Sequence, residues 1–198
     1  MNTDLAGTVD RALLQTGPMH GLQERPMQVA MAQAVAAAIE RHRHLVVEAA
    51  PGVGKTLAYL LPALASGARL LVSTATRNLQ DQLCLEDLPR ALELVDRRRD
   101  VVRLKGRRNY LCLLRLEQHR RHADREVMSS ALFEQIAAAA ARHVDAELDE
   151  LIATLDARSR RHAAANRHRL TATAASCLGE ACPHAAGCTW QRQRSRAA

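Results

Sequence analysis

A glycine-rich turn that ends in lysine and threonine constrains this chain more than any other feature of its sequence. Residues 49–56 read AAPGVGKT, between the apolar runs 45–47 and 57–61. This order predicts a strand, a phosphate-binding loop and a helix. Backbone N–H groups of such a loop point toward a phosphate, and the helix N-terminus adds about half a positive charge. The sequence therefore predicts a nucleotide site lined by Ala50, Pro51, Gly52, Val53, Gly54, Lys55 and Thr56.

Two side chains of this loop are candidates for a direct chemical role. The ammonium of Lys55 is expected to reach the outer phosphates, and the hydroxyl of Thr56 to ligate Mg²⁺. Ala49 stands where the strict motif has glycine, so the match is to the loose form, while Pro51 forbids a helix through the loop. The alternative is a chance Gly-Lys-Thr in a surface turn, which the flanking strand and helix patterns disfavour.

The first hundred residues alternate strand-like and helix-like patterns. Residues 26–40 carry apolar side chains at helical spacing, with Pro26 in the first turn. Helices are also expected over 57–65 and 77–85, and short buried strands over 45–48, 70–74 and 101–104. This alternation predicts an α/β fold with a parallel sheet covered on both faces.

After Gly106 the pattern changes, and residues 111–170 read as helices without a further apolar strand. One helix is expected around Leu113, a second over 131–143 and a third over 144–155. The third has an apolar stripe formed by Val144, Leu148, Leu151, Ile152 and Leu155. These residues predict a separate helical module, followed by the basic stretch 158–169 and a cysteine-rich tail.

Composition limits the partners and the compartment. The formal charge of +7 and the pI of about 9.8 fit a polyanionic partner such as nucleic acid. Asp4 and Asp10 make the N-terminus unlike a secretory signal, and no apolar run approaches the length of a membrane span. We therefore expect a cytoplasmic protein without a membrane partner, in which cysteines serve as metal ligands or free thiols.

The cysteines form a second constellation. Three of them follow a C-x4-C-x5-C spacing among turn residues, and a fourth opens the helical module: Cys112, Cys177, Cys182 and Cys188. Their setting favours metal ligation over burial in a core, and one metal centre would tie both ends of the module together. Thiolates suit zinc and an iron–sulfur cluster equally. His184 is an alternative ligand, although a loop role is simpler, and Cys84 between two leucines reads as a small buried hydrophobe.

A phosphate loop followed by a helical module with four cysteines resembles the XPD/DinG family of superfamily 2 DNA helicases, and its bacterial DinG/YoaA branch in particular. The matching segments are 25–28, 48–56, 73–83, 104–112 and 177–188, in the order of the family. The resemblance implies an incomplete RecA-like parallel sheet with a helical iron–sulfur insertion domain. Residues 1–108 would form the N-terminal part of the first motor domain, residues 109–190 the iron–sulfur domain, and residues 191–198 the start of the return to the motor domain.

The resemblance also implies a nucleotide and a cluster. Gln28 would read the adenine of ATP, since an amide both donates and accepts hydrogen bonds; without the family it would be a solvated helix residue. ATP would bind with Mg²⁺ at Lys55 and Thr56. The four cysteines would hold a [4Fe-4S] cluster, with zinc as the minor alternative.

DNA contacts are implied in two segments. Ser73, Thr74, Thr76 and Gln80 would line the path of single-stranded DNA, where hydroxyl and amide groups contact phosphates without reading bases; the alternative is a strand end and a helix cap. Lys105, Arg107 and Arg108, together with Arg103, would hold the DNA backbone near the point of strand separation, and a solvated basic face is the alternative. Tyr110 would stack on a base or pack over the cluster.

The chain departs from the family in its acidic motif. A helicase needs an acidic pair after a strand, and the candidate pair here, Asp149 and Glu150, is expected on the solvent face of a helix. The second motor domain with its arginine finger is also missing from these residues. We therefore expect the N-terminal fragment of an ATP-dependent 5′–3′ DNA helicase of repair, acting on single-stranded or forked DNA at the nucleoid and inactive by itself. The alternatives are a non-enzymatic nucleotide- and DNA-binding module, and a P-loop NTPase or kinase with a zinc-stabilised insertion.

Overall fold

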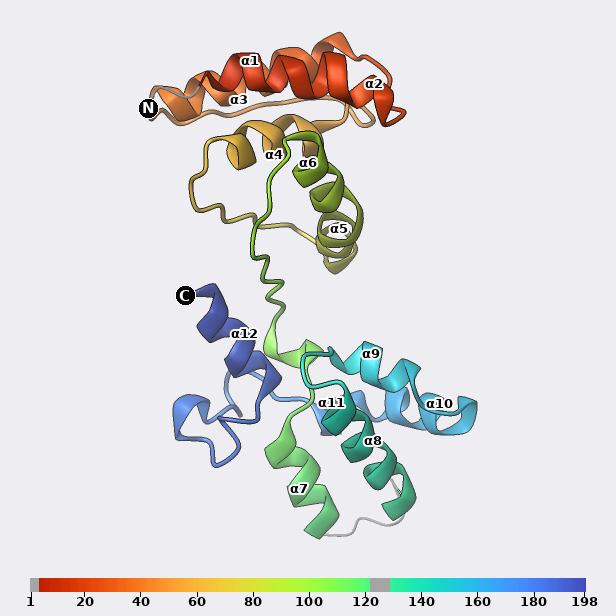
Figure 1. The fold of residues 1–198 in the computed structure, drawn as a ribbon. Coiled ribbons are helices and arrows are strands. Elements are labelled where there is room, and N and C mark those ends of the chain that lie inside the picture. The colour runs from red at the N-terminus through yellow and green to blue at the C-terminus, as the bar shows by residue number, and fades with distance from the viewer. Residues whose placement is uncertain (1–3, 122–128) are drawn as a thin grey trace. The chain divides into compact units, whose positions relative to one another are not determined.

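The computed structural model describes residues 4–121 and 129–198, and it divides the chain into two compact units. The first unit is Met1–Val101 and the second is Val102–Ala198. Both are built from helices (Figure 1). Each has its own core of apolar side chains, mostly aliphatic. No helix in the described ranges combines the length and the apolar character that crossing a membrane requires.

The first unit is organised around α3 (Pro26–Glu40) and α4 (Lys55–Ala65), which pack on each other. Ala32 and Ala36 of α3 are fully buried, and their small side chains let the two helix axes approach closely. Leu60 and Leu61 of α4 are also fully buried and form the centre of this core.

The remaining helices of the first unit cover these two. An N-terminal helical segment runs from α1 (Leu5–Asp10) through a π-helical turn (Arg11–Thr16) to α2 (Gly17–Met19). A second segment runs from α5 (Arg77–Gln82) through another π-helical turn (Leu83–Asp87) to α6 (Leu88–Leu94). Contacts of α1 with α3 and of α6 with α4 close the core from two directions.

The second unit is a cluster of short helices that opens with a 3₁₀ turn, Arg107–Asn109. Its core is formed by apolar side chains of α8 and α9, with Leu170 fully buried beside them. A second 3₁₀ turn, Gly179–Ala181, lies in the cysteine-rich tail. The helices are α7 (Leu113–Arg121), α8 (Ser130–Arg142), α9 (Leu148–Ala153), α10 (Ala157–Ala165), α11 (Arg167–Leu170) and α12 (Thr189–Ala197).

The helix predicted over 26–40 is confirmed, but the predicted parallel sheet is not present in the part of the chain that the structure describes. Segments 45–48, 70–74 and 101–104 have no strand pairing. Leu71 is 94% exposed, whereas its neighbour Val72 packs on the core. This alternation is that of a strand covered on one face. A parallel strand also needs hydrogen-bonded neighbours beside it and cover on its other face, and neither is found within the described ranges.

The helix predicted over 144–155 is shorter than expected. It begins at Leu148, because Glu147 and Glu150 form a capping box in which the Glu147 N–H donates to Glu150 Oε2 at 2.7 Å. Val144 lies outside the helix and is 54% exposed, so it does not belong to the apolar stripe. Asp149 and Glu150 are exposed as predicted, but they lie in the first turn of α9.

Candidate nucleotide and cysteine sites

The glycine-rich loop leads directly into α4, whose N-cap is Gly54. Gly52 and Gly54 have φ angles of +81° and +87°, in the left-handed region that costs other residues about 1–2 kcal/mol. A Cβ on Gly54 would also lie 2.2 Å from Gln28 Nε2. Both the backbone conformation and the close approach of Gln28 therefore require glycine at position 54.

Lys55 folds back over the loop that precedes it. Its Nζ donates hydrogen bonds to the carbonyl oxygens of Ala49 at 3.0 Å and Ala50 at 2.8 Å. Thr56 follows in the first turn of α4, where backbone N–H groups have no partner within the helix. Burial, and next the negative charge of Asp87, raise the pKa of Tyr59, while a hydrogen bond with the Thr56 side chain lowers it in part. The loop thus presents a cation and several helix-terminal donors together.

The start of α3 holds the same loop through two side chains. Arg25 Nη1 donates to the Gly52 carbonyl oxygen at 2.6 Å, and Gln28 Nε2 donates to the Gly54 carbonyl oxygen at 2.9 Å. Gln28 is 4% exposed. The structure therefore brings Gln28 to the loop, as a partner of its backbone. Sequence reasoning missed Arg25, and the signal that could have found it was its position three residues before Gln28 at a helix start.

The polar residues predicted to contact DNA in the first unit lie at the N-terminus of α5. The Leu79 N–H donates to Thr76 Oγ1 at 3.2 Å, which makes Thr76 the N-cap of this helix. Thr74 Oγ1 donates to the Thr76 carbonyl oxygen at 3.1 Å. Ser73 is exposed, and Gln80 lies one turn into α5. The four residues form one polar stretch in which Thr76 has a clear structural role.

Thr76 offers a test that separates capping from DNA contact. Thr76→Ala is expected to destabilise the first unit by about 1 kcal/mol, because the Leu79 N–H loses its acceptor. Thr76→Asp should keep the cap and the stability while its negative charge weakens DNA binding. Urea denaturation and fluorescence anisotropy with a single-stranded oligonucleotide measure the two effects. Unchanged DNA affinity in Thr76→Asp would exclude this position from the DNA path.

The basic segment before Cys112 is largely engaged inside the second unit. Lys105 is 8% exposed, and its Nζ lies 2.8 Å from Glu147 Oε2. Arg103 forms ion pairs with Glu147, Nε to Oε1 at 3.0 Å, and with Glu150, Nη2 to Oε1 at 2.8 Å. The Lys105 N–H also donates to the Tyr110 hydroxyl at 3.0 Å. These contacts tie the segment to the N-terminus of α9.

The two arginines that follow differ from each other. The guanidinium of Arg107 lies over the Trp190 ring, with Cζ 4.1 Å from the ring centroid. The Arg194 guanidinium lies 5.5 Å from the same centroid. Arg108, in contrast, has an exposed side chain. Of the basic residues predicted to contact DNA, Arg108 is therefore the one most open to a backbone phosphate.

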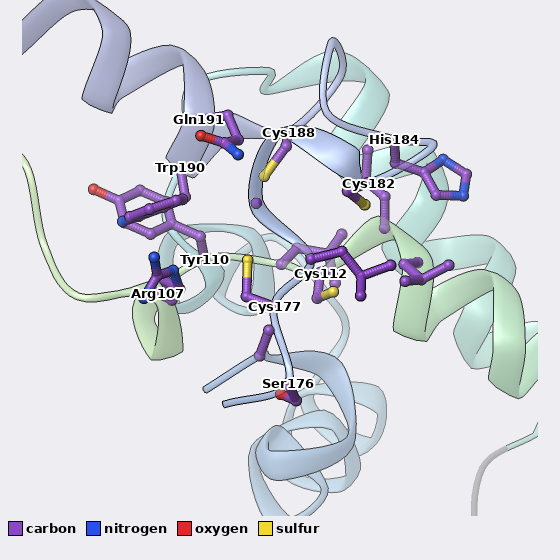
Figure 2. Close-up of a pocket in the computed structure, with 16 residues that line it drawn as sticks. Arg107, Tyr110, Cys112, Ser176, Cys177, Cys182, His184, Cys188, Trp190 and Gln191 are labelled. Carbon is purple, nitrogen blue, oxygen red and sulfur yellow. The ribbon is translucent and has the colours of Figure 1, made fainter. Parts of the chain in front are cut away.

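The four cysteines of the second constellation line one pocket (Figure 2). Cys112 directly precedes α7, and its N–H donates to the Leu170 carbonyl oxygen at 2.8 Å. Cys182 follows the Gly179–Ala181 turn, and Cys188 is the N-cap of α12. Cys177 completes the set from the preceding loop. The structure thus brings together residues from both ends of the helical module.

The four thiols form no disulfide and are half-buried, and they are not arranged as the ligands of a metal ion. In residues 4–121 and 129–198, no group of three or more His, Cys, Asp or Glu side chains is placed to hold a metal ion. Burial raises the pKa of the Cys112 thiol, backbone hydrogen bonds lower it in part, and the nearby Cys182 and Cys188 raise it further. Cys112, Cys182 and Cys188 line the same pocket, which is the geometric basis of this influence.

Two buried donors of the same pocket have no acceptor in the described structure. They are Arg107 Nε and Gln191 Nε2, and both residues line the pocket beside the cysteines (Figure 2). A buried N–H without a partner costs about 1–3 kcal/mol, so an acceptor bound in the pocket would stabilise these two groups. Sulfur atoms of a bound cluster would be acceptors of the fitting kind. The pocket residues therefore suit a sulfur-rich group in their chemistry.

The loop that carries Cys182 and Cys188 is held to α7 by His184, which also lines the pocket. His184 Nε2 lies 2.7 Å from Glu117 Oε2, which joins this loop to α7. The hydrogen bond with His184 is the main cause that lowers the pKa of Glu117. This contact supports the expectation that His184 is a loop residue rather than a ligand.

Comparison with known proteins gives a family match for the region of the glycine-rich loop. The family model described as DEAD/DEAH box helicase matches residues 27–106, which include Gln28 and the glycine-rich loop. No solved structure matches the chain.

Two kinds of relatives cover different shares of the chain. The ATP-dependent DNA helicase YoaA of Escherichia coli is 50% identical over 98 residues, which are 50% of this chain and 15% of that protein. The YoaA of Haemophilus influenzae is 48% identical over the same shares. The ATP-dependent helicase DinG of Mycobacterium tuberculosis is 37% identical over 200 aligned residues, 89% of this chain and 29% of that protein. The chain thus spans less than a third of the length of each of these relatives. It is a partial chain of the DinG-type helicase family.

Proposed function

We propose that this chain binds ATP with Mg²⁺ as the N-terminal part of the first motor domain of an ATP-dependent 5′–3′ DNA helicase. The observation that carries the proposal is the loop of Gly52, Gly54 and Lys55 at the start of α4. The names of the relatives, which are ATP-dependent DNA helicases, support ATP as the nucleotide.

The loop residues would act on the triphosphate by binding and orientation. The N–H groups of Ala50 and of residues 52–56 would surround a phosphate, since Pro51 has no N–H, and Lys55 would exchange the carbonyl oxygens of Ala49 and Ala50 for phosphate oxygens. Thr56 would contribute its hydroxyl to Mg²⁺. Gln28 would contact adenine, which requires its amide to turn away from the Gly54 carbonyl or to use its oxygen.

These residues by themselves are proposed to hold ATP without unwinding DNA. Asp149 forms an ion pair with Arg167, and Glu150 is occupied by the capping box and by Arg103. Neither carboxylate follows a strand, so the pair does not supply the acidic motif that positions Mg²⁺ and water in helicases. A non-enzymatic nucleotide- and DNA-binding role remains the alternative for this polypeptide.

Single-stranded or forked DNA is the proposed partner. Support comes from the net charge of +7, the polar stretch at the start of α5 and the exposed Arg108. Lys105 and Arg107 were part of the same expectation, and they would reach DNA only by giving up Glu147 and Trp190 respectively. We therefore assign the stronger DNA contact of this segment to Arg108.

A [4Fe-4S] cluster held by Cys112, Cys177, Cys182 and Cys188 is proposed for the second unit, with zinc as the minor alternative. The shared pocket and the two unsatisfied donors, Arg107 Nε and Gln191 Nε2, support a sulfur-rich group. When bound, such a cluster supplies structural crosslinks and a redox-active centre. The thiols would have to move toward one another and release their protons to bind it.

The RecA-like sheet and the division at residues 1–108, 109–190 and 191–198 are likewise proposed for the whole motor domain. The one-sided exposure of segment 70–74 supports this, because its bare face is the one that another layer would cover. The 97% exposed Val46 suits the same arrangement.

Nucleotide binding tests the central proposal. Lys55→Ala is expected to weaken ATP binding by about 10- to 100-fold, which is the loss of one or two charge-assisted hydrogen bonds. Isothermal titration calorimetry with Mg²⁺·ATP measures it, and Arg11→Ala, an exposed cation of the same unit, is the matched control. Equal affinity of Lys55→Ala and the wild type would place the nucleotide elsewhere.

A helicase assay tests the proposed inactivity. Unwinding of a 5′-tailed duplex by this chain, lost in Lys55→Ala, would overturn it.

A further inference from the structure

Arg25 is an exposed cation fixed on the glycine-rich loop from a different helix. Its side chain reaches from the N-cap of α3 to the Gly52 carbonyl oxygen at 2.6 Å. We propose that Arg25 is a positioning residue that shapes the loop for the phosphate chain of the nucleotide, whatever base the nucleotide carries. This inference rests on the proposed binding of a nucleotide by the loop.

Arg25 and Gln28 hold the peptide groups of the two glycines of the loop. Gly52 and Gly54 both have positive φ angles and lack a side chain that would restrict them. The carbonyl oxygen of each accepts a hydrogen bond from the start of α3, Gly52 from the N-cap residue Arg25 and Gly54 from Gln28 in the first turn. The same helix N-terminus therefore sets both contacts.

Fixing these carbonyl groups also fixes the donors on the opposite side of each peptide. In a planar trans peptide the C=O and the following N–H point in opposite directions. The Val53 N–H therefore points away from Arg25, and the Lys55 N–H points away from Gln28. An anion that meets these N–H groups finds them already oriented, and the entropy cost of ordering the loop is reduced.

Arg25 differs from Gln28 in carrying charge. Its guanidinium adds a permanent positive charge beside the loop, and the planar group has five N–H donors, more than the contact with Gly52 uses. Gln28 is buried and neutral, whereas Arg25 is exposed to the solvent from which a nucleotide arrives. The phosphate chain, rather than the base, is the part of a nucleotide that this arrangement favours.

The test compares three ligands and three variants of the whole chain. Binding of Mg²⁺·ATP, Mg²⁺·GTP and inorganic tripolyphosphate is measured by calorimetry for Arg25→Gln, Arg25→Lys and Arg90→Gln. Arg90 is the matched control, because it is also an exposed arginine that donates to a backbone carbonyl, that of His20 at 3.2 Å. Circular dichroism and thermal melting establish that each variant is folded.

Arg25→Gln is expected to lose about 10-fold in affinity for each ligand that the wild type binds, by the same factor. Arg25→Lys should recover part of this loss, since an ammonium can still donate to the Gly52 carbonyl, and Arg90→Gln should bind like the wild type. Affinities of Arg25→Gln within twofold of the wild type would overturn the inference and leave the proposed function intact. A loss confined to ATP would also overturn it, because Arg25 would then read the base. Absence of binding of all three ligands by the wild type would instead refute the proposed function, and this inference with it.

Discussion

Replacing Lys105 with methionine is expected to lower the free energy of unfolding of the second unit by about 3 kcal/mol. The ammonium of Lys105 and the carboxylate of Glu147 are 2.8 Å apart and almost completely buried. Removing one member of a buried ion pair leaves the other charge without compensation, which costs about 3–5 kcal/mol. The lower end applies here because Arg103 still neutralises Glu147. Urea denaturation followed by circular dichroism measures the change.

Two further variants make this result specific. Arg108→Met removes a neighbouring cation that is exposed, and its stability should stay within about 0.5 kcal/mol of the wild type. The double variant Lys105→Met with Glu147→Gln should recover part of the loss, because no carboxylate is then buried without Lys105, while the glutamine oxygen can still accept at the N-terminus of α9. Unchanged stability of Lys105→Met, together with reduced affinity for single-stranded DNA, would show that Lys105 is a DNA contact and not part of the fold.

The second large effect is expected at the cysteine pocket. Cys182→Ser should abolish the retention of iron and sulfide by protein purified without oxygen, because a serine hydroxyl does not replace a thiolate ligand of a cluster. The matched control is Cys84→Ser, which changes a half-buried thiol of the first unit. Iron, sulfide and zinc contents, with the visible absorption spectrum, are the measurements.

The measured metal content distinguishes an iron–sulfur cluster from zinc. Iron and sulfide in the wild type and Cys84→Ser, but not in Cys182→Ser, would support the cluster. Zinc without iron after reconstitution in the wild type would replace the cluster by the zinc alternative. Metal-free wild type would contradict both, and Arg107 Nε and Gln191 Nε2 would then need another acceptor. Loss of the metal should also destabilise the second unit, since binding energy of ordered ligands contributes to folding.

Local patterns predicted the helical parts of the chain well. The helix over 26–40 is confirmed as α3, because its periodic alanines and methionines and its proline in the first turn act within the segment itself. The segment over 144–155 was predicted less well. Its apolar spacing indicated one helix, while the capping box of Glu147 and Glu150 starts the helix at Leu148. Glu147 is at the same time the partner of Lys105, and this contact is not visible in either local sequence.

The predicted strands show what a local pattern cannot decide. Apolar runs such as 70–74 carry the residue types of buried strands, but a strand exists only when other segments pair with it. In the described residues that pairing is missing, and Leu71 faces solvent. The apolar residues of such a segment suit a buried strand. Whether the strand forms depends on other segments that pair with it and cover it, and the described residues do not provide them.

The sequence by itself determined the glycine-rich loop before α4 and the set of four cysteines. Both depend on residue type and spacing, the loop on glycines that accept positive φ angles at 52 and 54, and the cysteine set on residues whose thiols can ligate metals. Only the tertiary structure decided that Arg25 and Gln28 hold the loop, that Lys105 is buried and that the cysteines share a pocket. The physical reason is that burial and pairing are set by segments distant along the chain, whose approach no local pattern contains.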